Sequence, residues 1–471
     1  MVQESKIAVV ILAAGEGTRM KSNTAKVLFP ICGRPMVDYI LDAASDVKPG
    51  KIVVVIGHKG EEVANRIIDG WARDNDMGGN IEFAWQLQRR GTGHAVSCAQ
   101  DQIPGDCEHV MVLCGDTPLI TGEMLNRFVQ AHLSNRAELS LVTALLDDPG
   151  DYGRIRRDEN GNIVGIVEAN DLLPEDNHIK EINAGIYIAG KETLARLLSR
   201  LNDNNAKQEF YLTDIVKKGV EAGCTVASMM CQDVSIVQGV NDRYALALAE
   251  LRLRGTVLRD LCLSGVTIRD PRNTYIDSGV TIGADTIIEP GTFLRGKTSI
   301  GQGCIIGPNS EIIDSWVGDN SRIWSSVVEE SKVGENVRIG PFSHIRPDSV
   351  IEADASIGNF AEVKNSIIGQ GSKVHHHSYL GDSSIGCGVN IGAGTVTVNY
   401  DGLKKHRTVI EDNAFIGCNA NLIAPVTIGK DAYVAAGSTI TGDIPGGALG
   451  IARERQVNKE GWVAKRKEKT D

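Results

Sequence analysis

Two patterns of apolar residues divide the chain, and each predicts its own kind of structure. Up to about residue 240, short apolar runs such as Ile52–Ile56 and Val110–Cys114 alternate with longer amphipathic stretches such as 36–46 and 191–201. Short continuous apolar runs are typical of buried parallel strands, and the stretches between them are typical of helices that cover the sheet. The pattern therefore predicts an α/β domain over residues 1–240.

From residue 276 onward, aliphatic residues recur every six positions. The recurring residues are Ile276, Ile282, Ile288, Leu294, Ile300, Ile306 and Ile312, then Val333, Ile339, Ile345, Ile351, Ile357 and Val363, then Ile410, Ile416, Leu422, Ile428, Val434 and Ile440. This period fits neither a helix nor an alternating strand, whereas it fits a parallel β-helix in which each hexapeptide is one short strand and a turn. Glycine often follows the aliphatic residue, which fits tight corners. The repeat predicts a left-handed parallel β-helix over residues 263–445, an exception to the usual right-handed crossover.

The remaining segments complete the predicted organisation. Residues 241–262 carry apolar residues at helical spacing, which predicts a linker helix. Residues 399–407 break the six-residue period and are strongly basic, so we expect a loop that leaves one corner of the β-helix. Residues 446–471 are expected to form a basic C-terminal tail.

Composition narrows the function. The 49 basic and 60 acidic residues give a net charge of −11, which argues against a general nucleic-acid binder because such proteins need a dense basic face. The ten cysteines contain no CxxC pair, so a disulfide scaffold and a clustered zinc site are disfavoured and reduced thiols fit best. The longest early apolar run, Ile7–Ala14, is too short to span a bilayer. We expect a cytoplasmic protein without a nucleic-acid or membrane partner.

The loop after the first predicted strand is a candidate phosphate site. Gly15 and Gly17 let the backbone approach a ligand, and exposed amides can hold phosphate oxygens. Arg19 and Lys26 would add positive charge where a pyrophosphate leaves. Met20 stands where the third glycine of a dinucleotide fingerprint belongs, and no Gly-Lys-Ser/Thr follows, so dinucleotide-binding and P-loop sites are disfavoured. The alternative to a phosphate site is that Gly15 and Gly17 only form the turn that follows the strand.

Asp116 follows another predicted buried strand, at the edge where open α/β sheets hold ligands. A carboxylate there can hold Mg²⁺ against a triphosphate. An aspartate before a turn is more often structural when it stands alone. Together with the glycine loop, Asp116 becomes a candidate metal ligand.

Several motifs, in order along the chain, resemble those of one enzyme family. They are the glycine loop, Gln86–His94, Gly115-Asp116, Tyr152–Ile155, Ile166–Glu168, Glu181–Gly185 and Gly239–Arg243. Joined to the β-helix, they make almost the whole chain similar to the bifunctional N-acetylglucosamine-1-phosphate uridylyltransferases / glucosamine-1-phosphate N-acetyltransferases. The resemblance implies a Rossmann-like nucleotidyltransferase domain, an acetyltransferase β-helix and a role in cell-wall sugar synthesis.

For the first domain, the resemblance implies a site for UTP, N-acetylglucosamine 1-phosphate and Mg²⁺. Asp116 and Asn241 would bind the metal, and Arg19 and Lys26 would act on the leaving pyrophosphate. The other residues implied in binding the nucleotide sugar are Leu12, Ala13, Ala14, Gly15, Gln86, Gly91, Thr92, Gly153, Glu168 and Asn183, with Lys26 and Asn241. Without the resemblance, Glu168 and Asn183 would be interpreted as hydrogen-bonded loop residues.

Three adjacent histidines mark the β-helix. Side chains alternate in direction along a strand, so one chain cannot easily wrap a metal with all of His375, His376 and His377. The segment 373–382 resembles the family's acetyltransferase segment, whose catalytic histidine lies three residues before a tyrosine, here Tyr379. The resemblance thus implies His376 as the general base toward the sugar amine. His375 and His377 are interpreted as surface polar residues.

The resemblance also implies the groups that hold the acetyl-transfer substrates. Glucosamine 1-phosphate would contact Arg346, Lys364, Tyr379 and Asn390. Acetyl-CoA would contact Ala393, Asn399, Tyr400, Cys418, Ala436 and Arg453, with Lys404, Lys405 and the tail near its phosphates. Cys418 departs from the family, which usually has serine there. Because residues from distant coils must converge, we expect a homotrimer whose neighbouring chains share each acetyl site.

Two other hypotheses remain at this point. The chain could be a sugar-1-phosphate nucleotidyltransferase whose β-helix is only a trimerisation platform. It could also be a trimeric zinc hydratase that uses histidines at the interfaces. A purified protein without zinc that acetylates its substrate with acetyl-CoA would exclude the hydratase.

Overall fold

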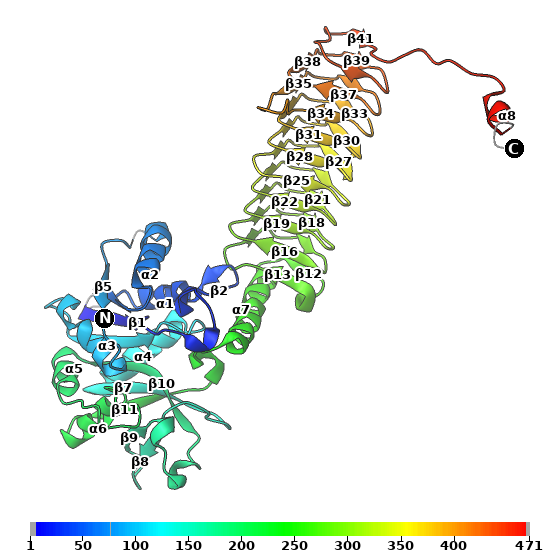
Figure 1. The fold of residues 1–471 in the computed structure, drawn as a ribbon. Coiled ribbons are helices and arrows are strands. Elements are labelled where there is room, and N and C mark those ends of the chain that lie inside the picture. Colours follow the sequence, from blue (N-terminus) through cyan, green and yellow to red (C-terminus); the bar gives the residue numbers. More distant parts are fainter. Residues whose placement is uncertain (1–5, 76, 468–471) are drawn as a thin grey trace. The chain divides into compact units, whose positions relative to one another are not determined.

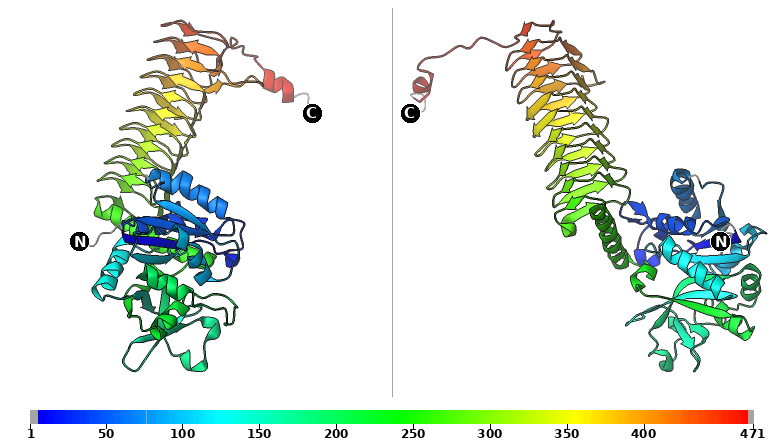
Figure 2. Two further views of the ribbon diagram at one scale, coloured as in Figure 1. Left: turned by 90° about the vertical axis from the view of Figure 1, so that its left-hand side faces the viewer. Right: turned by 180° about the vertical axis from the view of Figure 1, so that it is seen from behind.

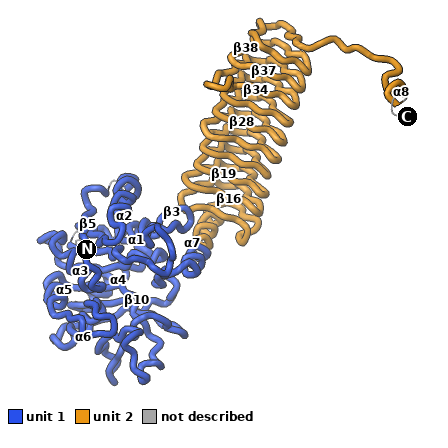
Figure 3. The backbone as a smooth tube through the Cα atoms, in the orientation of Figure 1, with its two compact units in different colours: residues 1–253 blue, residues 254–471 orange. Residues whose placement is uncertain are grey.

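The computed structural model describes residues 6–75 and 77–467. The chain forms two compact units, residues 1–253 and residues 254–471 (Figure 3). The helix α7 (Arg243–Leu263) occupies the segment predicted as a linker helix, and the division between the units falls within it. No helix among the described residues is long and apolar enough to cross a lipid bilayer.

A mixed sheet lies at the centre of the first unit (Figure 1), with the strand order β11-β7-β10-β6-β1-β4-β5. Strands β5, β4, β1 and β6 run parallel, which confirms the predicted α/β class. The sheet is not parallel throughout, because β10 runs antiparallel between β6 and β7. The bounds are β1 Ile7–Leu12, β4 Lys51–Ile56, β5 Ile81–Trp85, β6 His109–Cys114, β7 Leu139–Leu145, β8 Arg154–Arg157, β9 Ile163–Val167, β10 Glu181–Gly190 and β11 Val226–Cys231.

The continuous apolar runs arise because both faces of this sheet are covered. In β4, Ile52, Val54 and Ile56 belong to one hydrophobic core, and Val53 and Val55 belong to the core on the opposite face. The helices have the bounds α1 Met36–Ser45, α2 Gly60–Arg66, α3 Thr92–Cys98, α4 Gly122–Ser134, α5 Lys191–Leu198 and α6 Asp214–Glu221, and a short hairpin is formed by β2 Pro30–Ile31 and β3 Arg34–Pro35.

The second unit is a parallel β-helix, seen from two sides in Figure 2. Its first sheet contains β12 Thr267–Ile268, β15 Ile287–Ile288, β18 Ile305–Ile306, β21 Arg322–Ile323, β24 Arg338–Ile339, β27 Ser356–Asn359, β30 Lys373–His376, β33 Asn390–Ile391, β36 Phe415–Ile416, β39 Tyr433–Val434 and β41 Leu449–Gly450. Its second sheet contains β13 Thr274–Ile276, β16 Thr292–Arg295, β19 Glu311–Ile313, β22 Val327–Glu329, β25 His344–Ile345, β28 Glu362–Lys364, β31 Tyr379–Gly381, β34 Val396–Val398, β37 Asn421–Ile423 and β40 Thr439–Ile440. Its third sheet contains β14 Thr281–Ile282, β17 Ser299–Ile300, β20 Trp316–Val317, β23 Lys332–Val333, β26 Val350–Ile351, β29 Ile367–Ile368, β32 Ser383–Ile385, β35 Thr408–Ile410 and β38 Val426–Ile428. The short helix α8 (Trp462–Lys467) follows.

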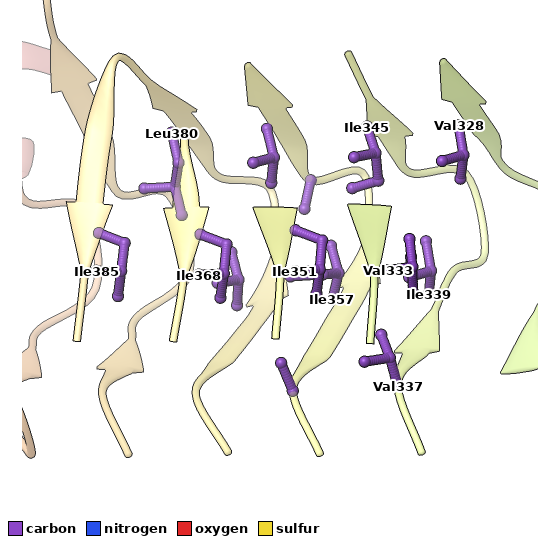
Figure 4. Close-up of a cluster of buried hydrophobic side chains, with 14 of the residues drawn as sticks. Val328, Val333, Val337, Ile339, Ile345, Ile351, Ile357, Ile368, Leu380 and Ile385 are labelled. Atoms are coloured by element: carbon purple, nitrogen blue, oxygen red, sulfur yellow. The ribbon is translucent and has the colours of Figure 1, made fainter. Parts of the chain in front are cut away.

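The six-residue repeat has a direct physical cause in this unit. The aliphatic side chains of successive coils point inward and stack on one another (Figure 4), as Val333, Ile351 and Ile368 of the paired strands β23, β26 and β29 do, each at 0% exposure. Adjacent coils approach closely at the corners. A Cβ atom on Gly358 would lie 2.0 Å from the carbonyl oxygen of His375, so this position requires glycine. The left-handed β-helix predicted from the repeat is confirmed.

The buried His132 and the partly buried His109 make the stability of the first unit depend on pH. His132 of α4 is 1% exposed, and its Nδ1 and Nε2 atoms lie 2.8 Å from Ser140 Oγ and 3.2 Å from His109 Nδ1. Burial lowers the pKa of His132 from its usual 6.5 to about 4, and also lowers the pKa of His109. Below pH 6.5 the unfolded chain therefore binds protons that the folded chain does not, and the folded state loses stability as the pH falls towards 4.

For His132 alone we expect a loss of about 3 kcal/mol between pH 7.5 and pH 4. Hydrogen exchange of peptides from β6 and α4, corrected for the intrinsic pH dependence of exchange, measures this loss. In His132→Gln, which does not titrate, the loss should be smaller. An equal loss in the variant and the parent protein would contradict the assignment.

Candidate active sites

A cavity of about 330 Å³, here called the first cavity, opens at the carboxyl ends of β1 and β6. Many of the residues predicted for nucleotide binding line it, although they are far apart in the sequence. Its lining consists of Leu12, Ala13, Ala14, Gly15, Glu16, Lys26, Val27, Gln86, Arg89, Gly91, Thr92, Ala95, Cys114, Asp116 and Glu209. Glu16, Arg89 and Glu209 are charged residues of this lining for which the sequence motifs imply no role.

The parallel register of β1 and β6 builds this cavity. Leu12 pairs with Cys114, so the glycine loop and Asp116 leave the sheet at the same edge. The Gly115 N–H donates to the Leu12 carbonyl over 2.9 Å. A Cβ atom on Gly115 would lie 2.9 Å from that same oxygen, so glycine is needed for the two loops to approach this closely.

Lys26 lies between the two predicted metal ligands. Its Nζ atom forms an ion pair with Asp116 and lies 3.2 Å from Asn241 Oδ1. The Val240 N–H donates to the Asp116 carbonyl over 2.7 Å, which holds Asn241 beside Asp116. A carboxylate and an amide oxygen that already face one cation are suitable oxygen ligands for Mg²⁺, with substrate phosphates completing the coordination. The residues therefore fit the predicted metal.

A second cavity of about 470 Å³ is lined by Thr18, Arg19, Asp151, Tyr152, Glu168, Ala169, Asn170, Lys207 and Asn241. Arg19 lines this cavity, where its Nη1 atom lies 2.9 Å from Asp151 Oδ2. Lys26 lines the first cavity and Asn241 the second, so the 3.2 Å contact between them joins the two cavities. A substrate in each cavity would meet its neighbour at Lys26.

Three residues predicted to bind the sugar lie together at the second cavity, and Glu168 is part of its lining. The Asn183 N–H donates to the Gly153 carbonyl over 2.9 Å, and Asn183 itself is buried. Glu168 accepts a 2.8 Å hydrogen bond from Thr213 Oγ1, and burial raises the pKa of Glu168. Tyr152 was not assigned a role from the sequence. Its hydroxyl accepts a 3.1 Å hydrogen bond from the Gly239 N–H, which joins two of the sequence motifs.

In the β-helix, three of the predicted acetyl-CoA residues stack at one corner. The Asn419 N–H donates to the Ala393 carbonyl over 2.7 Å, and the Gly437 N–H donates to the Cys418 carbonyl over 2.8 Å. Ala393, Cys418 and Ala436 consequently follow β33, β36 and β39 in successive coils. Cys418 is exposed, and the side chain of Arg453 lies beside Gly437.

His376 is exposed at the end of β30. Its Nδ1 atom lies 2.6 Å from Asn359 Oδ1, because β27 and β30 are paired and place Asn359 opposite His376. His377 stacks on Phe360 at 4.9 Å between ring centroids, so it is part of an exposed aromatic stack. Burial and the neighbouring His376 lower the pKa of His375. Asn359 belongs to no motif, and only the pairing of coils identifies it.

Positive charge gathers along the second sheet. Arg346 Nη1 donates to Glu362 Oε1 over 2.8 Å. The Lys405 ammonium lowers the pKa of Lys364, so Lys405 lies beside a residue predicted to hold the sugar phosphate. Two adjacent ammonium groups favour a bound anion. Asn390 lies apart from this group, in β33 of the first sheet.

The predicted basic loop is closed on itself. Tyr400 and Lys405 form an isolated β-bridge. Asp401 accepts hydrogen bonds from the Leu403 and Lys404 N–H groups and from His406 Nε2, and these bonds lower the pKa of Asp401 to about 2. Asn399 is anchored at the start of the loop by donating to Asp382. These contacts link the two ends of the loop to each other and to its tip.

A zinc site within one chain finds no support. Among the described residues there is no group of three or more histidine, cysteine, aspartate or glutamate side chains arranged to hold a metal ion. The hydratase hypothesis would therefore need ligands from more than one chain.

Comparison with known proteins agrees with this division of the chain. Residues 8–236 match the nucleotidyl transferase family, residues 279–314 and 407–442 match the bacterial transferase hexapeptide repeat, and residues 327–401 match the GMPPB C-terminal domain. The chain is 48% identical over 454 residues to the bifunctional protein GlmU of Geobacillus sp., covering 96% of this chain and 97% of that protein. It is 46% identical over 465 residues to the bifunctional protein GlmU of Pelobacter propionicus, covering 98% of this chain and 99% of that protein.

Proposed function

Because the chain belongs to the family of bifunctional GlmU proteins, we propose that it catalyses two successive reactions in two separate sites. The β-helix acetylates glucosamine 1-phosphate with acetyl-CoA. The α/β unit then transfers UMP from UTP to N-acetylglucosamine 1-phosphate, giving UDP-N-acetylglucosamine and pyrophosphate. The observation that carries this proposal is Lys26, which joins Asp116 and Asn241 where the two cavities meet.

In the uridylyl transfer, positioning and charge neutralisation are the main contributions of the protein. UTP occupies the first cavity with its base toward Gln86 and its phosphates over the glycine loop. The sugar phosphate enters from the second cavity, so its oxygen faces the α-phosphorus near Lys26. Lys26 neutralises the charge that develops on the transferred group, and Arg19 turns from Asp151 to the leaving pyrophosphate. Asp116 and Asn241 hold Mg²⁺, which supplies further charge neutralisation when it is bound.

In the acetyl transfer, His376 is the general base. Asn359 Oδ1 accepts the hydrogen bond from His376 Nδ1–H, so Nε2 is left unprotonated and takes the proton of the sugar amine as it attacks the thioester. Arg346 and Lys364 hold the sugar phosphate, with Lys405 beside them. Tyr379 and Asn390 contact the sugar ring.

The acetyl-CoA residues support a homotrimer. Ala393, Cys418 and Ala436 stack at the corner that follows the first sheet, whereas Arg346 and Lys364 lie at the far ends of strands in the second sheet. If a neighbouring chain faces the second sheet, its own corner with Ala393, Cys418 and Ala436 can hold acetyl-CoA next to the glucosamine 1-phosphate that Arg346 and Lys364 hold. Closed three-fold symmetry repeats this arrangement at every interface.

Replacing Asn359 by aspartate should shift the pH dependence of acetyl transfer. A carboxylate beside His376 favours the imidazolium form, so it raises the pKa of the base and the acidic limb of kcat/KM moves to higher pH. Asn359→Ala should lower kcat by about tenfold without this shift, because only the orientation is lost. The pH profile of acetyl transfer measures both effects. An unchanged acidic limb in Asn359→Asp would show that Asn359 does not contact the base.

The overall proposal is tested by supplying the purified protein with glucosamine 1-phosphate, acetyl-CoA, UTP and Mg²⁺. We expect UDP-N-acetylglucosamine and pyrophosphate, with N-acetylglucosamine 1-phosphate as the intermediate. Without acetyl-CoA, glucosamine 1-phosphate should not be acetylated and no UDP-N-acetylglucosamine should form. A protein that uses N-acetylglucosamine 1-phosphate but never acetylates glucosamine 1-phosphate would instead have a β-helix that serves only assembly.

A further inference from the structure

The side-chain amide of Gln86 is held in one orientation at the wall of the first cavity. Gln86 is 5% exposed, and its Nε2 atom donates to the Gly91 carbonyl over 2.9 Å. The same Nε2 atom lies 3.2 Å from His94 Nδ1. An amide nitrogen carries two hydrogens and no acceptor site, so these two contacts use both of its hydrogens. Gln86 Oε1, which can only accept a hydrogen bond, remains for a ligand.

This orientation depends on the protonation of His94. Because the amide nitrogen can only donate, His94 Nδ1 has to be the unprotonated atom of the ring, and the proton belongs on Nε2. His94 Nε2 lies 3.9 Å from Cys98 Sγ, one turn further along α3. Burial, and secondarily Arg90, lower the pKa of His94, and burial raises the pKa of the Cys98 thiol. Both groups are therefore uncharged at neutral pH.

The loop around this pair is fixed by the backbone. The Gly93 N–H donates to the Phe210 carbonyl, and the Phe210 N–H donates to the Arg90 carbonyl, over 2.8 and 2.7 Å. No hydrogen bond of the Gly91 N–H is found within the part of the chain that the structure describes. The cavity wall thus offers an acceptor, Gln86 Oε1, next to a backbone donor at Gly91.

We propose that His94 is a positioning residue that holds Gln86 as an acceptor and thereby makes the first cavity select uracil over cytosine. Uracil presents a donor at N3 and an acceptor at O4, which complement this pair. Cytosine presents an acceptor at N3 and a donor at its amino group, so both contacts are reversed. The base cannot slide by one position to avoid this mismatch, because the phosphates are held by the glycine loop. The inference rests on the proposed binding of UTP in this cavity.

Substitution of His94 tests the proposal through the ratio of kcat/KM for UTP to that for CTP. In His94→Leu the Gln86 amide keeps only its contact with the Gly91 carbonyl and is held less firmly, so we expect the ratio to fall by about tenfold. His94→Asn places an acceptor oxygen near the position of Nδ1 and should restore most of the ratio. Ser97→Ala, an exposed position on the same helix, should leave the ratio unchanged. Hydrogen exchange of peptides from β1 and β6 in each variant reports whether the α/β unit is folded.

The outcomes separate this inference from the proposed function. An unchanged ratio in an active His94→Leu protein would overturn the proposed role of His94. A merely structural residue would lower kcat/KM for UTP and for CTP by the same factor. Loss of UTP and CTP binding alike, measured by calorimetry, would also overturn it, because His94 would then support the cavity without selecting the base. If the parent protein does not use UTP, the proposed function fails instead.

Discussion

Asp116→Asn is expected to lower uridylyl transfer by about 10²–10³-fold and to leave acetyl transfer within twofold of the parent protein. The substitution keeps the size of the side chain and removes the charge that faces Lys26. A neutral amide binds Mg²⁺ more weakly than a carboxylate, and it no longer holds the Lys26 ammonium in place. Initial rates of the two half-reactions, measured separately on the same preparation, give both numbers.

Asp101→Asn is the matched control, because it removes one carboxylate from an exposed position. Chelation by EDTA should likewise stop uridylyl transfer and spare acetyl transfer. Binding of Mn²⁺ followed by electron paramagnetic resonance should weaken in Asp116→Asn and not in the control. If both activities fell together in a folded Asp116→Asn protein, the two sites would not be independent.

His376→Ala is expected to lower kcat for acetyl transfer by about 10²–10⁴-fold, the usual contribution of a general base. Uridylyl transfer should not change, since His376 lies in the β-helix. His377→Ala is the matched control. The His377 ring stacks on Phe360, whereas the Asn359 amide oxygen contacts His376, so loss of the His377 ring should change acetyl transfer by less than tenfold.

Mixing His376→Ala chains with Arg453→Ala chains tests whether neighbouring chains share each site. If they do, some interfaces of the mixed assembly carry both intact residues, and part of the acetyl transfer returns. Exchange of subunits is verified by native mass spectrometry, which also gives the number of chains. Mixed assemblies that recover no activity would refute the shared site and leave His376 as a base within a single chain.

The sequence by itself determined the architecture of both units. The six-residue repeat follows from a local requirement, because each coil needs one inward aliphatic side chain and small residues where coils touch, as at Gly358. The apolar run Ile52–Ile56 reflects burial on both faces of a sheet. Such patterns can be read from the sequence because burial is imposed at every repeat or along every strand, whatever the distant contacts are.

Only the tertiary structure decided which polar groups meet. Lys26 contacts Asp116 and Asn241, which are 90 and 215 residues away. The antiparallel strand β10 and the pairing of Asn359 with His376 also have no local signal. A side-chain hydrogen bond requires two atoms about 3 Å apart with the right orientation, and residue type fixes neither the distance nor the angle. Gln86 is the clearest case: the family resemblance implies that it binds the nucleotide, but only its contacts with Gly91 and His94 leave its amide oxygen as an acceptor for a ligand.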